Sequence, residues 1–269
     1  MLLLILLVLA ALYLLAIVPR MAGRPDPTAL MGRYYAHRGL HDNASDAPEN
    51  SMAAFRKAVE AGYGIELDVQ LTRDRVPVVF HDESLRRMCG VSGNVRDYTL
   101  EELARFPLLR SQERIPRFED VLALVDGRVP LIVEIKIHED AGEVCARADA
   151  LLRAYRGAYC IESFHPQAVL WYRRHRPEVI RGQLSCSFRQ KDHRETPGEL
   201  LVHHLLTNFL TLPDFIAYDH HGKGSLSRVL CRRLYRALAV AWTIRSQAEL
   251  DAARNDFDLF IFEGFRPDR

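Results

Sequence analysis

Residues 64–82 read Gly64-Ile-Glu-Leu-Asp-Val-Gln-Leu-Thr-Arg-Asp-Arg-Val-Pro-Val-Val-Phe-His-Asp82, which predicts two strands around a short polar turn. Only about four residues separate Leu71 from Val76. A crossover between parallel strands needs about a dozen residues, so these two strands must form an antiparallel hairpin.

The hairpin is expected to gather polar side chains on one of its faces. Successive side chains of a strand alternate between faces, so Glu66 and Asp68 share a face. If the turn centres on Arg73-Asp74 or on Asp74-Arg75, His81 lies opposite Glu66 or Asp68 on that same face. Two carboxylates and an imidazole within contact distance indicate the beginning of a metal and acid/base site.

Composition places few limits on function. The chain has 269 residues, 48% of them apolar, which is ordinary for a globular protein with a substantial core. The formal net charge of +1, from 36 basic and 35 acidic residues, gives no electrostatic argument for a nucleic-acid partner. The five cysteines are scattered, without zinc spacing, and are expected to be reduced thiols in a reducing compartment. They are Cys89, Cys145, Cys160, Cys186 and Cys231.

The N-terminal residues are much more apolar than the rest. Leu2 to Val18 is an uninterrupted apolar run, about 26 Å long as a helix, which predicts a transmembrane anchor over residues 1–19 and a linker over 20–33. Basic residues follow the run rather than precede it. The positive-inside rule then places the protein in the cell membrane as a single-pass protein, with its main domain in the cytoplasm. Those basic residues are Arg20, Arg24 and Arg33.

The remainder alternates strand and helix patterns and predicts an α/β fold, a closed (β/α)8 TIM barrel over residues 34–269. The hairpin's return strand and an insertion at about 83–117 would decorate the second strand. Within the insertion, Thr99 and Glu102 predict a helix with a capping box. The eight parallel strands are expected at 34–37, 65–70, 131–136, 159–163, 180–185, 215–218, 238–243 and 258–262.

Polar side chains gather at the carboxyl ends of these strands, where barrels carry their chemistry. Glu66, Asp68 and Glu134 offer three carboxylates, which suit a hard cation such as Ca2+ or Mg2+ better than zinc. Arg38 and Lys136 suit a phosphate group. The residues at or near the strand ends are His37, Arg38, Glu49, Asn50, Glu66, Asp68, His81, Glu134, Lys136, Trp242 and Glu263.

Two histidines at this mouth, His37 and His81, suit a general base and a general acid in phosphodiester cleavage. The other histidines are expected to be ordinary surface or core residues. They include His165, His175, His193, His203, His204, His220 and His221.

Several motifs, in this order, resemble the glycerophosphodiester phosphodiesterase family over roughly residues 34–263. The likeness is strong in the first half and thinner from 164 to 235. The motifs are Ala36-His-Arg-Gly39, Pro48-Glu-Asn-Ser51, Glu66-Leu-Asp-Val-Gln-Leu-Thr72, Val78-Val-Phe-His-Asp82, Ile115-Pro116 and Glu134-Ile-Lys136, with Ser163-Phe164 and Trp242-Thr243 as later points of likeness.

The resemblance implies a metal-dependent TIM-barrel hydrolase that releases an alcohol and glycerol phosphate. By position, Glu66, Asp68 and Glu134 would bind the divalent metal, Ca2+ or Mg2+, and His37 and His81 would be the acid/base pair. Arg38 and Lys136 would hold phosphate. Glu49 would join the metal or orient a histidine or the glycerol. A glycerol hydroxyl would act as the internal nucleophile, giving a cyclic phosphate that water then opens. Which histidine is the base stays open.

Two positions depart from the family pattern. Ile244-Arg245 stand where the family has Val-Asn after Trp-Thr, and Phe262-Glu263 stand where it has Thr-Asp. Arg245 and Glu263 are therefore expected on the substrate side of the site, where Trp242 also lies in the family pattern. These departures leave the chemistry in place and put the substrate's head group in question.

Three functions stay open at this point. The first is hydrolysis of small glycerophosphodiesters, or of lysophospholipids in lysophospholipase D fashion, next to a membrane. The second is a phospholipase-C-like or polymer-directed phosphodiesterase on the same barrel. The third is a non-catalytic membrane module, which the intact set of site residues argues against.

Overall fold

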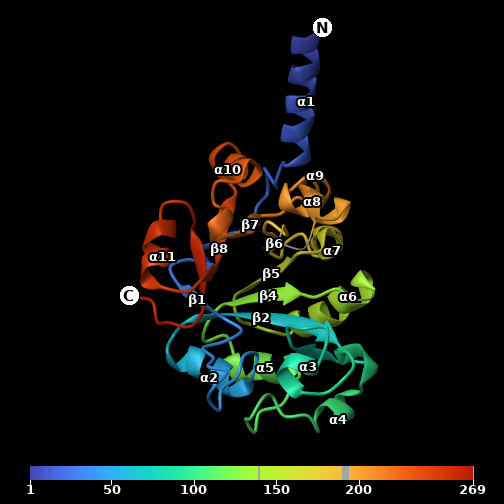
Figure 1. Ribbon diagram of the computed structural model, residues 1–269, viewed down its shortest axis with the longest axis vertical. Coiled ribbons are helices and arrows are strands. Elements are labelled where there is room, and N and C mark those ends of the chain that lie inside the picture. Colours follow the sequence, from blue (N-terminus) through green and yellow to red (C-terminus); the bar gives the residue numbers. More distant parts are fainter. Residues whose placement is uncertain (139, 190–193, 269) are drawn as a thin grey trace.

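The computed structural model describes residues 1–138, 140–189 and 194–268, and Figure 1 shows its course. His193 lies outside these residues. Within the described ranges eight strands run parallel, in the order β1-β9-β8-β7-β6-β5-β4-β2, and the pairing of β1 with β2 closes the barrel. The parallel strands are β1 (Tyr34–His37), β2 (Gly64–Leu71), β4 (Leu131–Ile135), β5 (Tyr159–Ser163), β6 (Arg181–Ser185), β7 (Phe215–Asp219), β8 (Leu238–Ile244) and β9 (Leu259–Phe262). Each lies within two residues of its prediction, so the predicted barrel is confirmed.

Helices surround the strands because each connection returns over the outside of the barrel. Phe55 on α2 and Phe118 on α5 are fully buried against the sheet, as an amphipathic pattern predicts. The helices around the barrel are α2 (Met52–Glu60), α5 (Phe118–Val125), α6 (Ala141–Leu152), α7 (Pro166–His175), α8 (Pro197–His203), α9 (Asn208–Thr211), α10 (Leu226–Arg233) and α11 (Gln247–Ala253).

The pattern of residues 199–210 predicts a single helix, but the structure divides this segment between α8 and α9. Leu205 takes a left-handed conformation, with φ of 57°, and its side chain is fully buried. The chain therefore turns between α8 and α9, because burying Leu205 outweighs the cost of interrupting the helix.

The predicted membrane-spanning helix over 1–19 is also not found. The N-terminal helix α1 (Leu2–Ala16) has 15 residues, about 22 Å of rise, against a hydrocarbon core of about 30 Å. Ile17 has left the helix and is buried in the core, where Asn208 donates a hydrogen bond to its carbonyl oxygen at 3.1 Å. Among the described residues, no helix is both long and apolar enough to cross a membrane.

The segment between α1 and β1 is packed against the barrel. The Arg20 guanidinium donates to the Pro177 carbonyl oxygen at 2.7 Å. A short 3-10 turn, η1 (Thr28–Leu30), places Leu30 in the apolar cluster inside the barrel, and the Tyr35 hydroxyl donates to the Leu30 carbonyl oxygen at 2.7 Å. This segment thus covers the amino-terminal end of the barrel, opposite the predicted site.

The insertion after β2 contains α3 (Arg86–Cys89), η2 (Val95–Asp97) and α4 (Leu100–Leu103). Its apolar side chains form a small cluster of their own with Phe80. Thr99 caps α4, and Thr99 and Glu102 make both bonds of the capping box, as predicted. The insertion is therefore an ordered unit beside the mouth of the barrel.

The hairpin forms, but its predicted registers are both wrong. Strand β3 (Pro77–Val79) pairs Val79 with Val69, a register that would set His81 opposite Leu67. The pairing is centred on one residue, Asp74, whereas both predictions centred it between two residues. Arg75, in this turn, takes a left-handed conformation with φ of 64°. His81 still reaches the site because β3 ends at Val79 and the alternation of faces stops there.

Candidate active site

Three carboxylates converge at the carboxyl ends of two neighbouring strands. Asp68 on β2 is the register partner of Glu134 on β4, and Glu66 precedes Asp68 by two residues on the same face. All three side chains are buried, and their ligand atoms lie within 4.8 Å of one another. They are thus close enough to share one cation.

The neighbouring basic side chains do not remove the repulsion among the three carboxylates of this acidic centre. Burial, and then repulsion from Asp68 and Glu134, raises the pKa of Glu66 well above its usual range. Burial also raises the pKa of Glu134, in spite of Lys136. For Asp68 the opposite holds, because Lys136, His81 and Arg38 outweigh burial and lower its pKa. A divalent cation fits the centre because it would relieve this repulsion.

Two basic side chains, Lys136 and Arg38, border the carboxylates, as the sequence predicts. Lys136 Nζ lies 2.8 Å from Glu134 Oε1 and 3.0 Å from Asp68 Oδ1. Arg38 takes a left-handed conformation, with φ of 54°, and its backbone N–H donates to Glu66 Oε2 at 3.0 Å. The following Gly39 is also left-handed, and a Cβ there would lie 3.0 Å from Ala54. The turn after β1 thus holds Arg38 against the acidic centre.

His37 lies between a carboxylate in the loop after β9 and the acidic centre. Its Nδ1–H donates to Glu263 Oε2 at 2.8 Å, while Nε2 lies 3.8 Å from Glu66 Oε2. Burial lowers the pKa of His37 to about 4, although the bond to Glu263 acts in the other direction. That same bond lowers the pKa of Glu263 to about 2. At neutral pH His37 is therefore a neutral imidazole with a lone pair on Nε2, directed toward the centre.

His81 is held in a similar way by its neighbour in sequence. Its Nδ1 lies 2.7 Å from Asp82 Oδ1, and Arg87 donates to both oxygens of Asp82. His81 lines a cavity of about 520 Å3 together with Glu134 and Lys136. Both predicted acid/base histidines thus have a carboxylate on one ring nitrogen, which leaves the other for substrate.

Glu49 does not belong to the acidic centre. It accepts hydrogen bonds from Arg38 at 2.7 Å, from Arg87 at 2.7 and 2.8 Å, and from Asn43 at 2.8 Å. Burial opposes its ionisation, but Arg87 and Arg38 lower its pKa to about 2. Both of its oxygens accept these hydrogen bonds, so Glu49 holds the Arg38 and Arg87 side chains in place.

The two predicted substrate-side residues lie across the mouth. Trp242 on β8 packs edge-on against Phe164, with ring centroids 5.5 Å apart. Its buried Nε1–H has no hydrogen-bond partner in the described part of the chain. Arg245 is largely exposed, and its guanidinium lies 3.4 Å from Glu263 Oε2, the oxygen that holds His37.

Sequence reasoning missed several residues that support the site. Glu162 on β5 is buried, pairs in register with Glu134, and has its pKa raised by burial and by Glu134. Its position on β5 matches that of Glu134 on β4, and this match could have identified Glu162 from the sequence. Asn50, which was expected near the strand ends, donates to Asp68 Oδ2 at 2.8 Å. No sequence pattern identified Arg87, which joins Asp82 to Glu49 from the insertion.

A second cavity adjoins the histidine side of the mouth. It has a volume of about 630 Å3 and is bounded by the loop after β1 and the residues after β9. Charged side chains at its wall include Asp42, Lys57, Glu263 and Arg266. Its wall also carries Leu40, Phe262 and Phe265, so it combines charged and apolar surface.

Comparisons with known proteins identify the family to which the chain belongs. The sequence profile of the Glycerophosphoryl diester phosphodiesterase family matches residues 37–254. The chain is 43% identical over 114 residues to a glycerophosphodiester phosphodiesterase of Bacillus altitudinis, covering 40% of this chain and 45% of that protein. It is also 43% identical over 109 residues to one of Caldanaerobacter subterraneus, covering 38% of this chain and 44% of that protein. The alignments thus span less than half the length of these two relatives.

Solved structures share the fold. A phosphodiesterase of Oleispira antarctica, solved with the product sn-glycerol-3-phosphate, superposes with a TM-score of 0.70, at 21% identity, over 87% of this chain and 94% of that one. A glycerophosphodiester phosphodiesterase of Thermotoga maritima superposes with a TM-score of 0.63, at 24% identity, over 86% of this chain and 94% of that one. With its barrel and a profile match over most of its length, the chain belongs to the glycerophosphoryl diester phosphodiesterase family.

Proposed function

We propose that this protein hydrolyses glycerophosphodiesters to an alcohol and glycerol phosphate. The observation that carries the proposal is the acidic centre of Glu66, Asp68 and Glu134, flanked by two histidines that are each held by a carboxylate. The family membership and the product named with the Oleispira antarctica structure support this choice of substrate.

The acidic centre would hold one hard divalent cation, Ca2+ or Mg2+, through Glu66, Asp68 and Glu134. When bound, that cation would neutralise charge on the phosphoryl oxygens. Arg38 and Lys136, which border the carboxylates, would bind the phosphate from its other sides. Glu49 would keep the Arg38 guanidinium in place for this contact.

His37 would act as the general base. Its Nδ1–H is committed to Glu263, so the lone pair on Nε2 is the atom that accepts a proton from the attacking hydroxyl. His81, with Nδ1 on Asp82, would donate a proton from Nε2 to the oxygen of the departing alcohol. The attacking group would be a hydroxyl of the substrate's own glycerol, and a water would then open the cyclic phosphate.

The departing alcohol would be polar. His81 would protonate the departing oxygen, so the alcohol would leave on the His81 side, where the lining of the cavity of about 520 Å3 includes Asp82, Glu83 and His138 and favours a water-soluble alcohol. The glycerol would extend on the His37 side, into the cavity whose wall carries Asp42, Lys57 and Arg266. Lysophospholipids are the alternative substrates, and they would have to place an acyl chain near these charges.

A substrate panel with matched variants tests the proposal. The full chain would be assayed with glycerophosphocholine, glycerophosphoethanolamine, a bis-glycerol phosphodiester and lysophosphatidylcholine. We expect release of glycerol phosphate from the water-soluble diesters, with kcat reduced about 10²- to 10⁴-fold in His37→Ala and in His81→Ala. The control is His175→Ala, a change at an exposed histidine on α7. Full activity in His37→Ala, or turnover of the lysolipid alone, would reject this version of the function.

A further inference from the structure

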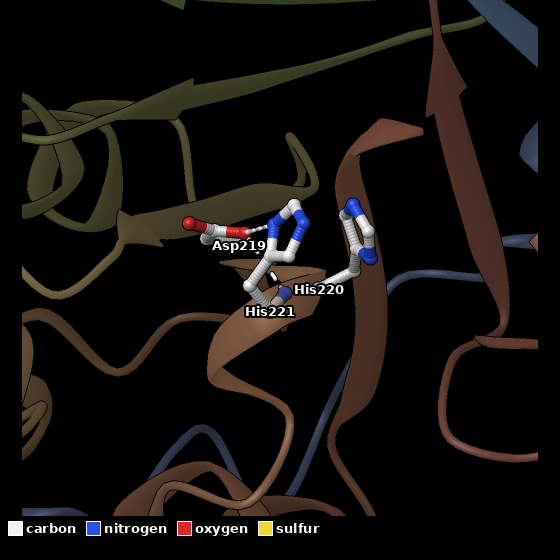
Figure 2. A group of neighbouring side chains, drawn as sticks. All are labelled: Asp219, His220 and His221. Atoms are coloured by element: carbon white, nitrogen blue, oxygen red, sulfur yellow. Dashed lines mark hydrogen bonds and ion pairs between the residues drawn. The ribbon is translucent and has the colours of Figure 1, made fainter. Parts of the chain in front are cut away.

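Three chemistry-bearing residues stand together at the end of β7, away from the acidic centre. Asp219, His220 and His221 each place a possible ligand atom within 4.8 Å of the other two. Figure 2 shows the His221 ring between the Asp219 carboxylate and the His220 ring. We propose that these three residues bind a divalent transition-metal ion of the zinc class.

His220 is prepared for a metal by its surroundings. Its side chain is 9% exposed, and its imidazole hydrogen-bonds the backbone of Thr243 on β8. Nε2 is buried and has no hydrogen-bond partner among the described residues, so the bond to Thr243 uses Nδ1. Metal-binding histidines commonly have this arrangement, with one nitrogen fixed by a carbonyl oxygen and the other left for the ion.

The atom that faces His220 Nε2 is a carboxylate oxygen, which a cation at this position would also stabilise. Glu249 Oε2, from α11, lies 3.5 Å from His220 Nε2 and accepts the Arg245 backbone N–H at 2.6 Å. With the Nδ1 proton donated to the Thr243 backbone, Nε2 and the carboxylate oxygen present lone pairs to each other. An ion bound at Nε2 would turn this unfavourable pair into an attraction.

His221 and Asp219 already place two ligand atoms close together. Nδ1 of His221 lies 3.0 Å from Asp219 Oδ1, and with the imidazole proton on Nε2 both atoms could bind one ion. The ring centroids of His220 and His221 are 3.9 Å apart. Ligand atoms about 2.0 Å from a tetrahedral zinc ion lie about 3.3 Å from one another, so modest side-chain rotation is enough to close the site. His221 is 68% exposed and has room for that rotation.

The ligand set differs in kind from that of the acidic centre. Two imidazoles and one carboxylate favour zinc-class ions, whereas the acidic centre offers carboxylates alone and suits Ca2+ or Mg2+. Asp219 is the register partner of Trp242, so the histidine site opens at the same end of the barrel as the acidic centre. The exposure of His221 gives an ion access from solvent and leaves positions for water.

Metal titration of the full chain tests this proposal. Saturating Mg2+ would occupy the acidic centre, and Co2+ would then be added while its visible absorption reports imidazole ligation. We expect one further equivalent of Co2+, displaced by Zn2+. We expect its affinity to fall about 10-fold or more in His220→Gln and in His221→Ala. His221→Ala changes an exposed side chain, so a loss of binding there is not a loss of folding.

Two control variants show whether the ion binds elsewhere on the chain. His203, the last residue of α8, and the adjacent His204 have stacked rings 4.3 Å apart, and Glu195 lies on His203 Nδ1. His203→Ala therefore tests for general binding by histidine pairs. Asp68→Asn tests whether the ion occupies the acidic centre instead. Retained binding in both controls supports the site. Binding that is unchanged in His220→Gln and His221→Ala, or equally reduced in His203→Ala, overturns it.

Discussion

Glu263 connects the substrate side of the mouth to the chemistry. One oxygen, Oε2, accepts the His37 Nδ1–H at 2.8 Å and lies 3.4 Å from the Arg245 guanidinium. A carboxylate in this position fixes the ring orientation and the tautomer of His37. The residue that appears in the sequence as a departure from the family pattern is thus the one that would prepare His37 to act as a base.

Replacing Glu263 by glutamine tests this role through the pH dependence of the reaction. Glutamine removes the negative charge that favours the imidazolium, so the pKa of His37 falls further below its present value of about 4. The acid limb of kcat/KM should move to lower pH, while kcat at neutral pH drops about 10- to 100-fold because the ring is less firmly oriented. Asp251→Asn, an exposed change on α11, is the control. An acid limb that moves to higher pH would contradict the assignment.

Glu162 provides a test of the electrostatics that does not depend on catalysis. Burial and Glu134 raise its pKa well above the ordinary value of 4.5, so the folded protein holds this proton more tightly than the unfolded chain. Stability is therefore lost as pH rises from about 4.5 toward the folded-state pKa. In chelator, Glu162→Gln should lose less stability than the native chain over this rise. Urea unfolding at a series of pH values measures the difference, and identical slopes would show that the pKa of Glu162 is not raised in the folded protein.

At the scale of single residues, sequence patterns identified the candidate metal ligands and missed most of the residues that hold the site in place. Residues two apart on a strand point to the same face, which puts Glu66 beside Asp68 and Glu134 beside Lys136. These pairs were therefore predictable. The partner of His37 is 226 residues away in the sequence, and no local pattern reports such a contact.

Among the elements, α1 shows how hydropathy alone misplaces a boundary. The apolar run continues to Val18, but the helix ends at Ala16 because Ile17 packs into the core under α9 and α10. Asn208 and Cys231 both donate to the Ile17 carbonyl oxygen, at 3.1 and 3.3 Å. These contacts attach the base of α1 to the barrel.

Asn208→Ala tests this attachment. Removing the amide leaves the buried Ile17 carbonyl oxygen with one donor fewer, so the free energy of unfolding should fall by about 1–3 kcal/mol. Denaturant unfolding of the full chain measures the change, with the exposed Asn255→Ala as the matched control. Equal stability of the two variants would mean that α1 is attached without this bond.

Two of the mispredicted segments share a physical cause. Arg75 in the hairpin turn and Leu205 between α8 and α9 both take left-handed conformations, with φ of 64° and 57°. Such positions usually carry glycine or asparagine, and prediction depends on those residues as signals. Where arginine or leucine takes their place, tertiary contacts decide the conformation, and no turn-forming residue in the sequence indicates the turn.

For the whole molecule, the barrel was the most predictable feature. Eight β-branched or apolar runs, each followed by a helical pattern, allow few other arrangements. Closure follows from the pairing of β1 with β2 and β9, and it brings His37, Glu66 and Glu263 to one mouth. The site is thus a consequence of closure, since its members come from both ends of the chain.

Cation binding should stabilise the whole barrel because it relieves repulsion among buried carboxylates. At about 100 times Kd, a bound ion adds about 2.7 kcal/mol, which raises Tm by about 5–10 °C in a domain of this size. Thermal unfolding with Mg2+ or Ca2+ against chelator measures the shift, and Asp68→Asn should reduce it. A sodium salt at the same ionic strength is the control, and an equal shift with sodium would mean that no specific ion is bound.

The proposed hydrolytic centre would need a cation, and one measurement tests this most directly. The full chain, freed of metal by a chelator, would be mixed with glycerophosphoethanolamine, and glycerol phosphate would be followed before and after Mg2+ or Ca2+ is restored. We predict no release without the ion, recovery when it is added, and no recovery in Asp68→Asn. Undiminished release in the chelator, or a native chain that releases nothing with either ion, would contradict the proposed role of the acidic centre.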